Sequence, residues 1–210
     1  MCESEVGLHV VHPNFDSVAF LDAADEERVA LDFGDAVAVA PDDGSVRWET
    51  ALEQGTYTTP VVGEELVFVA GSEGLLQAVE PDGIVRWSRN IRGNQSAPAV
   101  ADGTVYVISD NDDALFALDA ATGDERFRTG LGPTVDHRPA VGGDTAYVLG
   151  YNDGQALFVV DTETGDIQRT IALGGANSPY IDTNAGVSLA DDAVYLTGEW
   201  GDGSGVFRVG

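Results

Sequence analysis

Few side chains in this sequence are suited to bind a metal ion or to transfer a proton at neutral pH, and they are scattered. The three histidines are His9, His12 and His137. His9 and His12 are close enough to lie on one ligand face, but no acidic or sulfur partner follows at the spacing of zinc sites. We therefore predict no metal site and interpret these two histidines as incidental residues of a terminal strand.

Aspartate is the more abundant candidate ligand, and it gathers in short loops rich in oxygen atoms. These loops are PDDG at 41–44, DNDD at 110–113 and GDGSG at 201–205. None matches the calcium-binding loop of about twelve residues that ends in a glutamate. Asp and Gly also form tight turns between strands without any metal, and we predict such turns here.

Catalytic motifs are also missing from the sequence. It contains no G-x-S-x-G elbow, no P-loop and no glycine pattern for dinucleotides. The glycine-rich stretch 142–154 is not followed by a helical pattern, which a phosphate-binding loop requires. We predict a protein without catalytic residues, which is not an enzyme and has no cofactor.

The charge balance is strongly acidic. Thirty-six Asp and Glu residues stand against ten basic residues, all of them Arg, and the net charge is −26. Such a charge repels itself in dilute salt but is screened in molar salt, as in proteins of salt-accumulating halophiles. A calcium-loaded extracellular acidic protein is the alternative. Ten scattered arginines provide no cationic patch for nucleic acid or for an anionic membrane surface.

The surroundings of the protein are less clearly indicated. No stretch approaches the 18 apolar residues of a membrane span, and no signal peptide is recognised. Cys2 is the only cysteine, which rules out a disulfide within the chain. It is either the lipid-attachment residue of a lipoprotein or an ordinary thiol. We expect an extracytoplasmic or cell-surface protein, with a cytoplasmic location as the alternative.

An internal repeat dominates the sequence. DGSVRW at 43–48 recurs as DGIVRW at 82–87, and weaker copies follow as TGDERF at 122–127 and TGDIQR at 164–169. Their glycines are 39, 40 and 42 positions apart, at positions 44, 83, 123 and 165. A proline recurs in step at positions 60, 98, 139 and 179. A period near forty indicates a repeat architecture.

Each repeat contains four short runs of Val, Tyr, Phe and Leu separated by turn residues, which predicts four strands and a β-propeller blade. Strand A surrounds the proline, B is the aromatic run, C precedes the glycine turn and D carries Arg–Trp. Proline fits strand A because an edge strand or a strand start tolerates the missing N–H. In the first and last repeats we place strand B at 17–22 and strand A around Pro179, so that 180–194 forms an A–B loop.

The prediction is therefore a single all-β domain of about five blades. The repeats are approximately residues 1–48, 49–87, 88–127, 128–169 and 170–210. The last repeat ends after strand C at 205–210, and residues 4–10 fall where the missing strand D would be. Two alternatives remain: a closed five-blade ring, expected to be a monomer, or a segment of a larger propeller of seven or eight blades.

The repeat resembles the pyrroloquinoline-quinone-like (PQQ-like) repeat, most clearly in LFALDAATGDERFR at 115–128 and in LQAVEPDGIVRW at 76–87. This family includes quinoprotein dehydrogenases, the outer-membrane assembly lipoprotein and acidic secreted proteins of halophilic archaea, and our chain is most similar to the last type. The resemblance implies that Trp48 and Trp87 pack between neighbouring blades. Phe127 and then Arg169 replace the tryptophan, so we expect the later blades to be less regular.

A quinoprotein dehydrogenase of this family would hold its quinone against a vicinal disulfide beside calcium, and one cysteine excludes that pair. We therefore expect a non-catalytic scaffold that binds a protein or an extracellular polymer, with a quinone-dependent oxidoreductase or its remnant as the alternative. Propellers bind partners where the loops between strands D and A converge. The predicted rim residues precede the prolines. Arg138 is either a charge partner of Asp136 and neighbouring acids or an anchor for a carboxylate or phosphate ligand, and Arg89 and Arg92 are added cations. They are Tyr57, Thr58, Gln95, Ser96, Asp136, His137, Arg138, Asn177 and Ser178.

Overall fold

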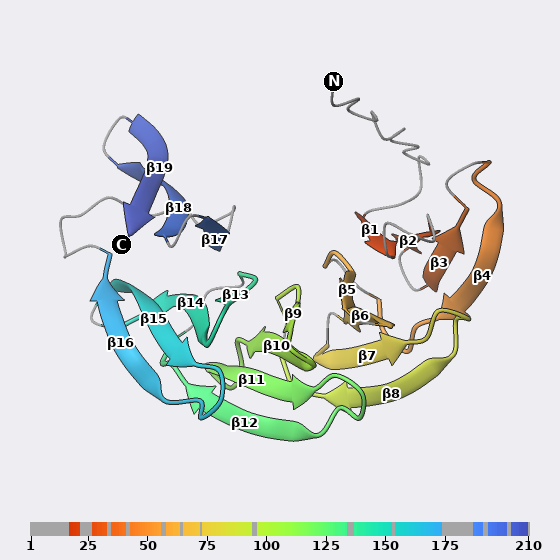
Figure 1. Ribbon diagram of the computed structural model, residues 1–210, viewed down its shortest axis with the longest axis horizontal. Helices are drawn as coiled ribbons and strands as arrows, with labels where there is room; N and C mark the ends of the chain where they lie inside the picture. The colour runs from red at the N-terminus through yellow and green to blue at the C-terminus, as the bar shows by residue number, and fades with distance from the viewer. Residues whose placement is uncertain are drawn as a thin grey trace.

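The chain folds into five antiparallel sheets that follow one another along the sequence, which confirms the predicted all-β propeller architecture (Figure 1). The computed structural model describes residues 17–21, 27–32, 35–40, 43–55, 58–63, 65–71, 73–93, 96–133, 137–152, 154–173, 187–190, 193–200 and 203–209. The strands, sheet by sheet, are β1 Ser17–Leu21, β2 Glu27–Asp32, β3 Asp35–Val39 and β4 Val46–Ala51; β5 Val61–Gly63, β6 Leu66–Ala70, β7 Leu75–Val79 and β8 Val85–Asn90; β9 Ala99–Ala101, β10 Thr104–Ser109, β11 Ala114–Asp119 and β12 Glu125–Gly130; β13 Ala140–Gly142, β14 Thr145–Tyr151, β15 Gln155–Asp161 and β16 Ile167–Ala172; and β17 Val187–Ala190, β18 Ala193–Trp200 and β19 Gly203–Val209.

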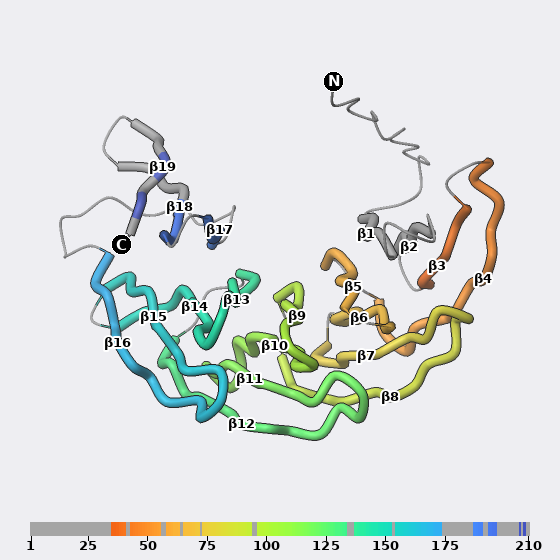
Figure 2. The backbone as a smooth tube through the Cα atoms, in the orientation of Figure 1, coloured from red at the N-terminus to blue at the C-terminus, as the bar shows by residue number. Residues whose placement is uncertain are grey.

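The sheets stand side by side in an arc (Figure 1). Within each sheet the strands pair in chain order, so the first and the last strand are the two edges. The short first strands β5, β9 and β13 line the concave side, and the fourth strands β8, β12 and β16 form the convex side (Figure 2). The first and last sheets lie at the two ends of the arc.

The hairpin between the third and fourth strands is the most regular part of each unit. Its glycine has a positive φ in four sheets, with 71° at Gly44, 88° at Gly83, 74° at Gly123 and 79° at Gly165. A side chain is strained in this region, whereas glycine enters it freely. After each turn the register shifts by one residue, for example between Ala78 and Val79. The recurring Asp–Gly or Thr–Gly pair in the sequence predicts this turn.

The proline of each unit immediately precedes the innermost strand. Pro60, Pro98 and Pro139 stand directly before β5, β9 and β13. The missing N–H of proline therefore removes no hydrogen bond from the sheet ladder.

The strand assignments at the two ends of the repeat were wrong. Residues 17–21 form β1, which is the first strand of its sheet and not the second, because 27–32 supplies the second strand. In the last sheet the first strand among the described residues is β17 at Val187–Ala190, in the stretch predicted as a loop, whereas the segment around Pro179, where strand A was predicted, lies outside the described residues. The connection from β17 to β18 therefore spans only 191–192, and no long A–B loop exists there. Among the described residues the last sheet has three strands and ends with β19, as predicted, and residues 4–10, where its fourth strand was expected, lie outside the described residues.

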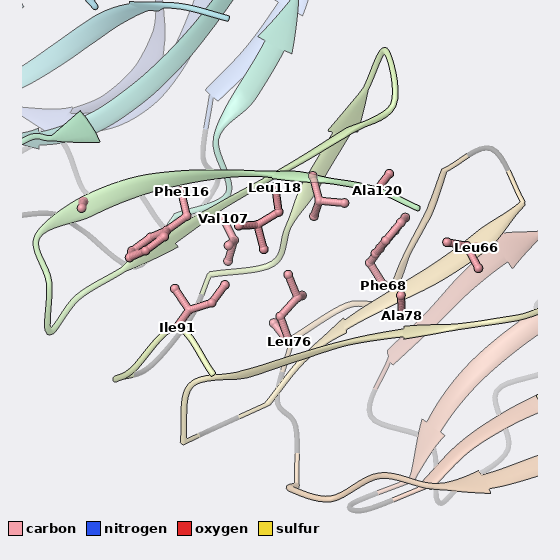
Figure 3. Close-up of a cluster of buried hydrophobic side chains, with 12 residues drawn as sticks. Leu66, Phe68, Leu76, Ala78, Ile91, Val107, Phe116, Leu118 and Ala120 are labelled. Atoms are coloured by element: carbon pink, nitrogen blue, oxygen red, sulfur yellow. The ribbon is translucent and has the colours of Figure 1, made fainter. Parts of the chain in front are cut away.

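The hydrophobic core lies between neighbouring sheets. Between the second and third sheets, Phe68 and Leu76 from one side meet Val107 and Phe116 from the other (Figure 3). Phe68 and Leu76 are fully buried. The middle strands of the central sheets are buried along nearly their whole length, because they are covered on both faces. This explains their continuous apolar runs.

A second contact between sheets uses the tryptophans. Trp48 and Trp87 occupy equivalent places, opposite Ala38 and Ala78 of the preceding strand. The indole Nε1 of Trp48 donates to the carbonyl oxygen of Pro81 at 2.7 Å, and that of Trp87 to the carbonyl oxygen of Ala120 at 2.9 Å. Each acceptor belongs to the next sheet, so the tryptophan of one unit joins it to the unit that follows.

The glycine turn of the next sheet receives this indole. A Cβ atom on Gly123 would lie 2.8 Å from Cδ2 of the Trp87 ring, and one on Gly83 would lie 3.0 Å from Cδ2 of Trp48. Two residues after each aromatic, a side chain donates to the carbonyl oxygen of the same glycine. The donor–acceptor pairs are Thr50–Gly83, Arg89–Gly123 at 3.0 Å and Thr129–Gly165 at 2.6 Å.

The later sheets keep the same fold but lack some of the contacts that the tryptophans make between sheets. Phe127 packs against Gly165, where a Cβ atom would lie 2.6 Å from the ring. Arg169 is exposed, but it pairs with Val159 in the register of the tryptophans and with the same register shift. In place of the indole, Ile171 packs against the core that joins the fourth and fifth sheets. Apolar packing therefore maintains the regularity that the sequence put in question.

Candidate functional site

The segments that connect the outer strand of one sheet to the inner strand of the next carry the predicted rim. We call them the D–A segments, and the described parts are 52–55 with 58–60, 91–93 with 96–98, and 131–133 with 137–139. Each ends at the proline before an inner strand. They therefore lead from the convex to the concave side of the arc (Figure 1).

One repeated hydrogen bond fixes the residue that follows the outer strand to its own sheet in three sheets, and two of these residues begin the D–A segments at 91–93 and 131–133. The amide of Ile91 donates to the carbonyl oxygen of Gly74 at 2.7 Å, and that of Leu131 to the carbonyl oxygen of Asp113 at 2.9 Å. Leu173 makes the equivalent bond to Gln155 at 2.9 Å. The side chains of Ile91 and Leu131 are buried. Each of these loops therefore leaves its sheet at a fixed position.

The ends of two D–A segments are also held, at the positions two residues before Pro60 and Pro98. The Thr58 hydroxyl donates to the carbonyl oxygen of Ala70 at 3.0 Å. The Ser96 hydroxyl accepts the amide of Ile108 at 3.3 Å, and Ser96 is only 3% exposed. Both side chains extend the pairing of strand A with strand B. Ser96 is therefore a buried structural residue and leaves the candidate surface.

The other predicted rim residues are placed only in part. His137 is half-buried and already has an interaction partner, whereas Thr59 and Arg138 are exposed. Tyr57, Gln95, Asp136, Asn177 and Ser178 lie outside the described residues.

The cations expected beside this rim differ in their surroundings. Arg92 is exposed at the start of its D–A segment. Arg89 does not reach the rim, because its guanidinium binds the carbonyl oxygen of Gly123 and the Glu125 carboxylate, each at 3.0 Å.

A cavity of about 370 Å³ lies between the inner strands of the last three sheets. Its walls come from the starts of β9 and β13 and from β17, and Arg138 is the charged residue among them. The residues that line it are Ala99, Val100, Arg138, Pro139, Ala140, Val141, Val187, Ser188 and Leu189. The sequence analysis found Arg138 but missed the β17 wall.

The sequence contains a pattern that identifies β17, the strand that the sequence analysis missed. The nine residues SLADDAVYL at 188–196 match AVADGTVYV at 99–107 and AVGGDTAYV at 140–148. Alignment on the aromatic strand, instead of on the proline, identifies β17.

The described arginines of the outer surface are mostly paired with carboxylates of their own sheet. Arg126 donates to Asp119 at 2.9 Å and holds the pKa of that carboxyl below its usual value. The hydrogen bond from Arg86 to Glu80, at 2.8 Å, raises the pKa of the guanidinium. Arg138 differs, because burial lowers its pKa while no described residue is its ion-pair or hydrogen-bond partner.

A quinoprotein dehydrogenase with this repeat would hold a quinone beside a calcium ion, and the residues that line this cavity do not fit a calcium site. Calcium takes six to eight oxygen ligands, yet the residues lining the cavity include no carboxylate. Within the described ranges, no three His, Cys, Asp or Glu side chains are grouped as metal ligands. The same part of the chain contains no helix that could cross a membrane.

Comparison with known proteins identifies relatives of one kind. The sequence profile of the family described as outer membrane protein assembly factor BamB matches residues 14–98 and 72–208. The assembly factor BamB of Yersinia pestis is 30% identical over 158 residues, which are 67% of this chain and 39% of that protein. BamB of Moranella endobia (strain PCIT) is 28% identical over 181 residues, which are 78% and 46% of the two chains.

Solved structures agree on the fold. The crystal structure of BamB from Moraxella catarrhalis superposes with a TM-score of 0.68 at 18% identity, over 83% of this chain and 56% of that one. The computationally designed Ika8 protein gives a TM-score of 0.72 at 15% identity, over 91% and 57%. The chain spans less than half the length of the curated relatives it matches. Since the profile covers nearly all of its residues, the chain belongs to the β-propeller repeat family of the outer membrane protein assembly factor BamB.

Proposed function

We propose that this chain is a non-catalytic scaffold that binds another protein or an extracellular polymer through its D–A segments. The observation that carries the proposal is the anchoring of these segments. Two of them are fixed at their first residue by the same backbone hydrogen bond, which recurs in a third sheet. Loops held on a rigid frame bind a partner without a large ordering cost. The relatives named as assembly factors support this class of function by analogy.

The proposed contact surface is the exposed part of these segments. It includes Thr59, Arg92 and Arg138 among the described residues. Tyr57, Gln95, Asp136, Asn177 and Ser178 belong to it by sequence position alone. On a chain with a net charge of −26, exposed arginines would attract acidic groups of the partner.

The cellular location and the adaptation to salt are part of the same proposal. We place the protein outside the cytoplasm or at the cell surface of a salt-accumulating organism, with Cys2 as a candidate lipid-attachment residue. Relatives named for the outer membrane support the location, and the charge of −26 without any lysine supports the adaptation to salt.

The test is chemical cross-linking of the tagged chain in an extract of its source organism at molar salt, with two matched variants. Thr59→Glu adds a carboxylate to a D–A segment, where it would repel the acidic groups expected on the partner, and Thr170→Glu adds the same group to the exposed face of the outer strand β16. We expect one discrete cross-linked partner with the wild type and with Thr170→Glu. Thr59→Glu should reduce its yield at least tenfold. A yield that Thr59→Glu leaves unchanged, or that Thr170→Glu abolishes, would contradict the proposed surface.

The oxidoreductase alternative has a separate test. Addition of pyrroloquinoline quinone with calcium should leave the thermal midpoint unchanged, because a ligand shifts it only by binding the folded state. A rise that saturates with quinone concentration, together with dye reduction, would overturn the non-catalytic assignment.

A further inference from the structure

We propose that the cavity between β9, β13 and β17 binds a small carboxylic acid with an apolar body, whose carboxylate pairs with Arg138. This site goes beyond the scaffold function and does not depend on it. The carboxylate would enter from the exposed side of Arg138, and the apolar body would occupy the space between the inner strands.

The walls determine the apolar half of the ligand. Val100, Val141 and Leu189 come from three successive sheets and are partly buried, with the ring of Pro139 beside them. These side chains supply apolar surface that a ligand can remove from water, while Arg138, Ser188 and backbone groups supply the polar share of the lining. The volume of about 370 Å³ is at the lower end of the range for small-ligand pockets. The site therefore suits a ligand with one ring or a short branched chain.

Small residues at the ends of the inner strands keep these walls close together. A Cβ atom on Gly142 would lie 2.8 Å from Cδ1 of Leu189, and one on Gly63 would lie 2.3 Å from Cγ1 of Val100. Neighbouring inner strands thus approach to contact distance at β5–β9 and at β13–β17.

Arg138 determines the charged half of the ligand. Arg86, Arg89 and Arg126 each have a carboxylate within 3.0 Å. Arg138 has no such partner among the residues with described positions, and burial disfavours its charged form. An unpaired, partly desolvated guanidinium gains most from an anion that replaces the lost water. Its planar fork matches a carboxylate with two parallel hydrogen bonds.

The balance of charge favours a carboxylate over a phosphate. The lining residues offer one cation and, besides backbone groups, the Ser188 hydroxyl. One guanidinium neutralises a single negative charge, whereas a phosphate near neutral pH carries between one and two and holds its water strongly. Apolar walls cannot replace that water.

The experiment is a titration with 3-phenylpropionate and its uncharged amide, followed by saturation-transfer NMR and calorimetry at fixed molar salt. The acid and the amide share the apolar body and differ in the charge. Since a hydrogen bond to a charged group contributes about 1.5–3 kcal/mol, the acid should bind at least tenfold more tightly than the amide. Equal binding of the acid and the amide would overturn the proposal.

Three variants locate the site. Arg138→Gln should weaken binding of the acid at least tenfold and leave binding of the amide nearly unchanged. Arg169→Gln, at an exposed arginine of the outer strand β16, is the matched control and should bind as the wild type does. Ser188→Phe fills the cavity while it retains Arg138, and should abolish binding of both ligands. Wild-type affinity in folded Arg138→Gln, checked by circular dichroism, would overturn the assignment.

One further titration distinguishes the source of the carboxylate. A tetrapeptide that ends in phenylalanine with a free carboxylate presents the same apolar acid as part of a chain. We expect it to bind no more tightly than 3-phenylpropionate, because the cavity has room for one apolar group. Binding at least tenfold tighter than the free acid would overturn the assignment to a small acid.

Discussion

Substitution of Gly123 by alanine tests how neighbouring sheets are joined. The added Cβ atom would lie 2.8 Å from both Cδ2 and Cε3 of Trp87, on a backbone with φ of 74°. The left-handed backbone costs an alanine roughly 1 kcal/mol, and overpacking against a ring in a joint adds about 1–3 kcal/mol. We therefore expect Gly123→Ala to reduce the free energy of unfolding by about 2–4 kcal/mol.

Gly44 provides a matched control within the same chain. It occupies the equivalent turn of the first sheet with φ of 71°, and no described atom lies within 4 Å of the place that an added Cβ atom would take. Gly44→Ala therefore carries the backbone cost alone, about 1 kcal/mol. Urea unfolding at molar salt, followed by far-ultraviolet circular dichroism, gives both values. The difference between them measures the contact with the indole.

A double-mutant cycle assigns this difference to Trp87. In a Trp87→Leu background the ring is gone, so Gly123→Ala should cost no more than Gly44→Ala. Equal losses for Gly123→Ala and Gly44→Ala in the wild-type background would refute the view that the turn glycine receives the indole. A penalty that persists without the ring would refute it as well.

Three further outcomes are expected from urea or thermal unfolding. Thr129→Val should cost about 1–3 kcal/mol, because the carbonyl of Gly165 loses its partner at a site where Thr129 is 7% exposed; an unchanged midpoint would contradict this. Backbone amides of its own turn, chiefly that of Thr164, hold the pKa of Asp161 below its usual value. The contribution of the Asp161 carboxylate to folding stability is therefore complete above the unfolded-state pKa of about 3.9. It is lost as pH falls through the lower folded-state pKa. The stability gap between the wild type and Asp161→Asn should accordingly close in acid, and a gap that widens would contradict the sign. Raising salt from about 0.1 to about 1 M shortens the screening length from about 10 to about 3 Å and should raise the thermal midpoint of a chain with a net charge of −26; a falling midpoint would contradict salt adaptation.

The sequence predicts the hairpins well because their determinants are local. A glycine with positive φ, such as Gly83, and the strand on each side of it lie within a few residues of one another. The period then indicates a stack of equal sheets. The places of Trp48 and Trp87 follow from the same register, because each sits at one fixed distance after its turn.

The ends of the repeat and the cavity were harder to predict because they depend on contacts between distant segments. The proline that marks three inner strands does not directly precede β1 or β17, so alignment on the prolines misassigned residues 17–22 and 187–190. Nothing near Ser96 reveals that its hydroxyl completes a strand ladder. Arg138 was a candidate from its charge alone, but the other walls of its cavity come from residues about forty positions before it and about fifty after it.

The joint between sheets also bears on how such a chain can lengthen. The first three units carry an aromatic ring on the last strand, and the turns of the second, third and fourth units carry the glycine that accepts the ring of the preceding unit. Tandem duplication of a whole unit therefore creates a new interface between sheets in which the ring and the glycine are already complementary. The near-identity of 43–48 and 82–87 is the trace of such copying, and insertion of one further unit of 39 or 40 residues should be tolerated far better than insertion of half a unit.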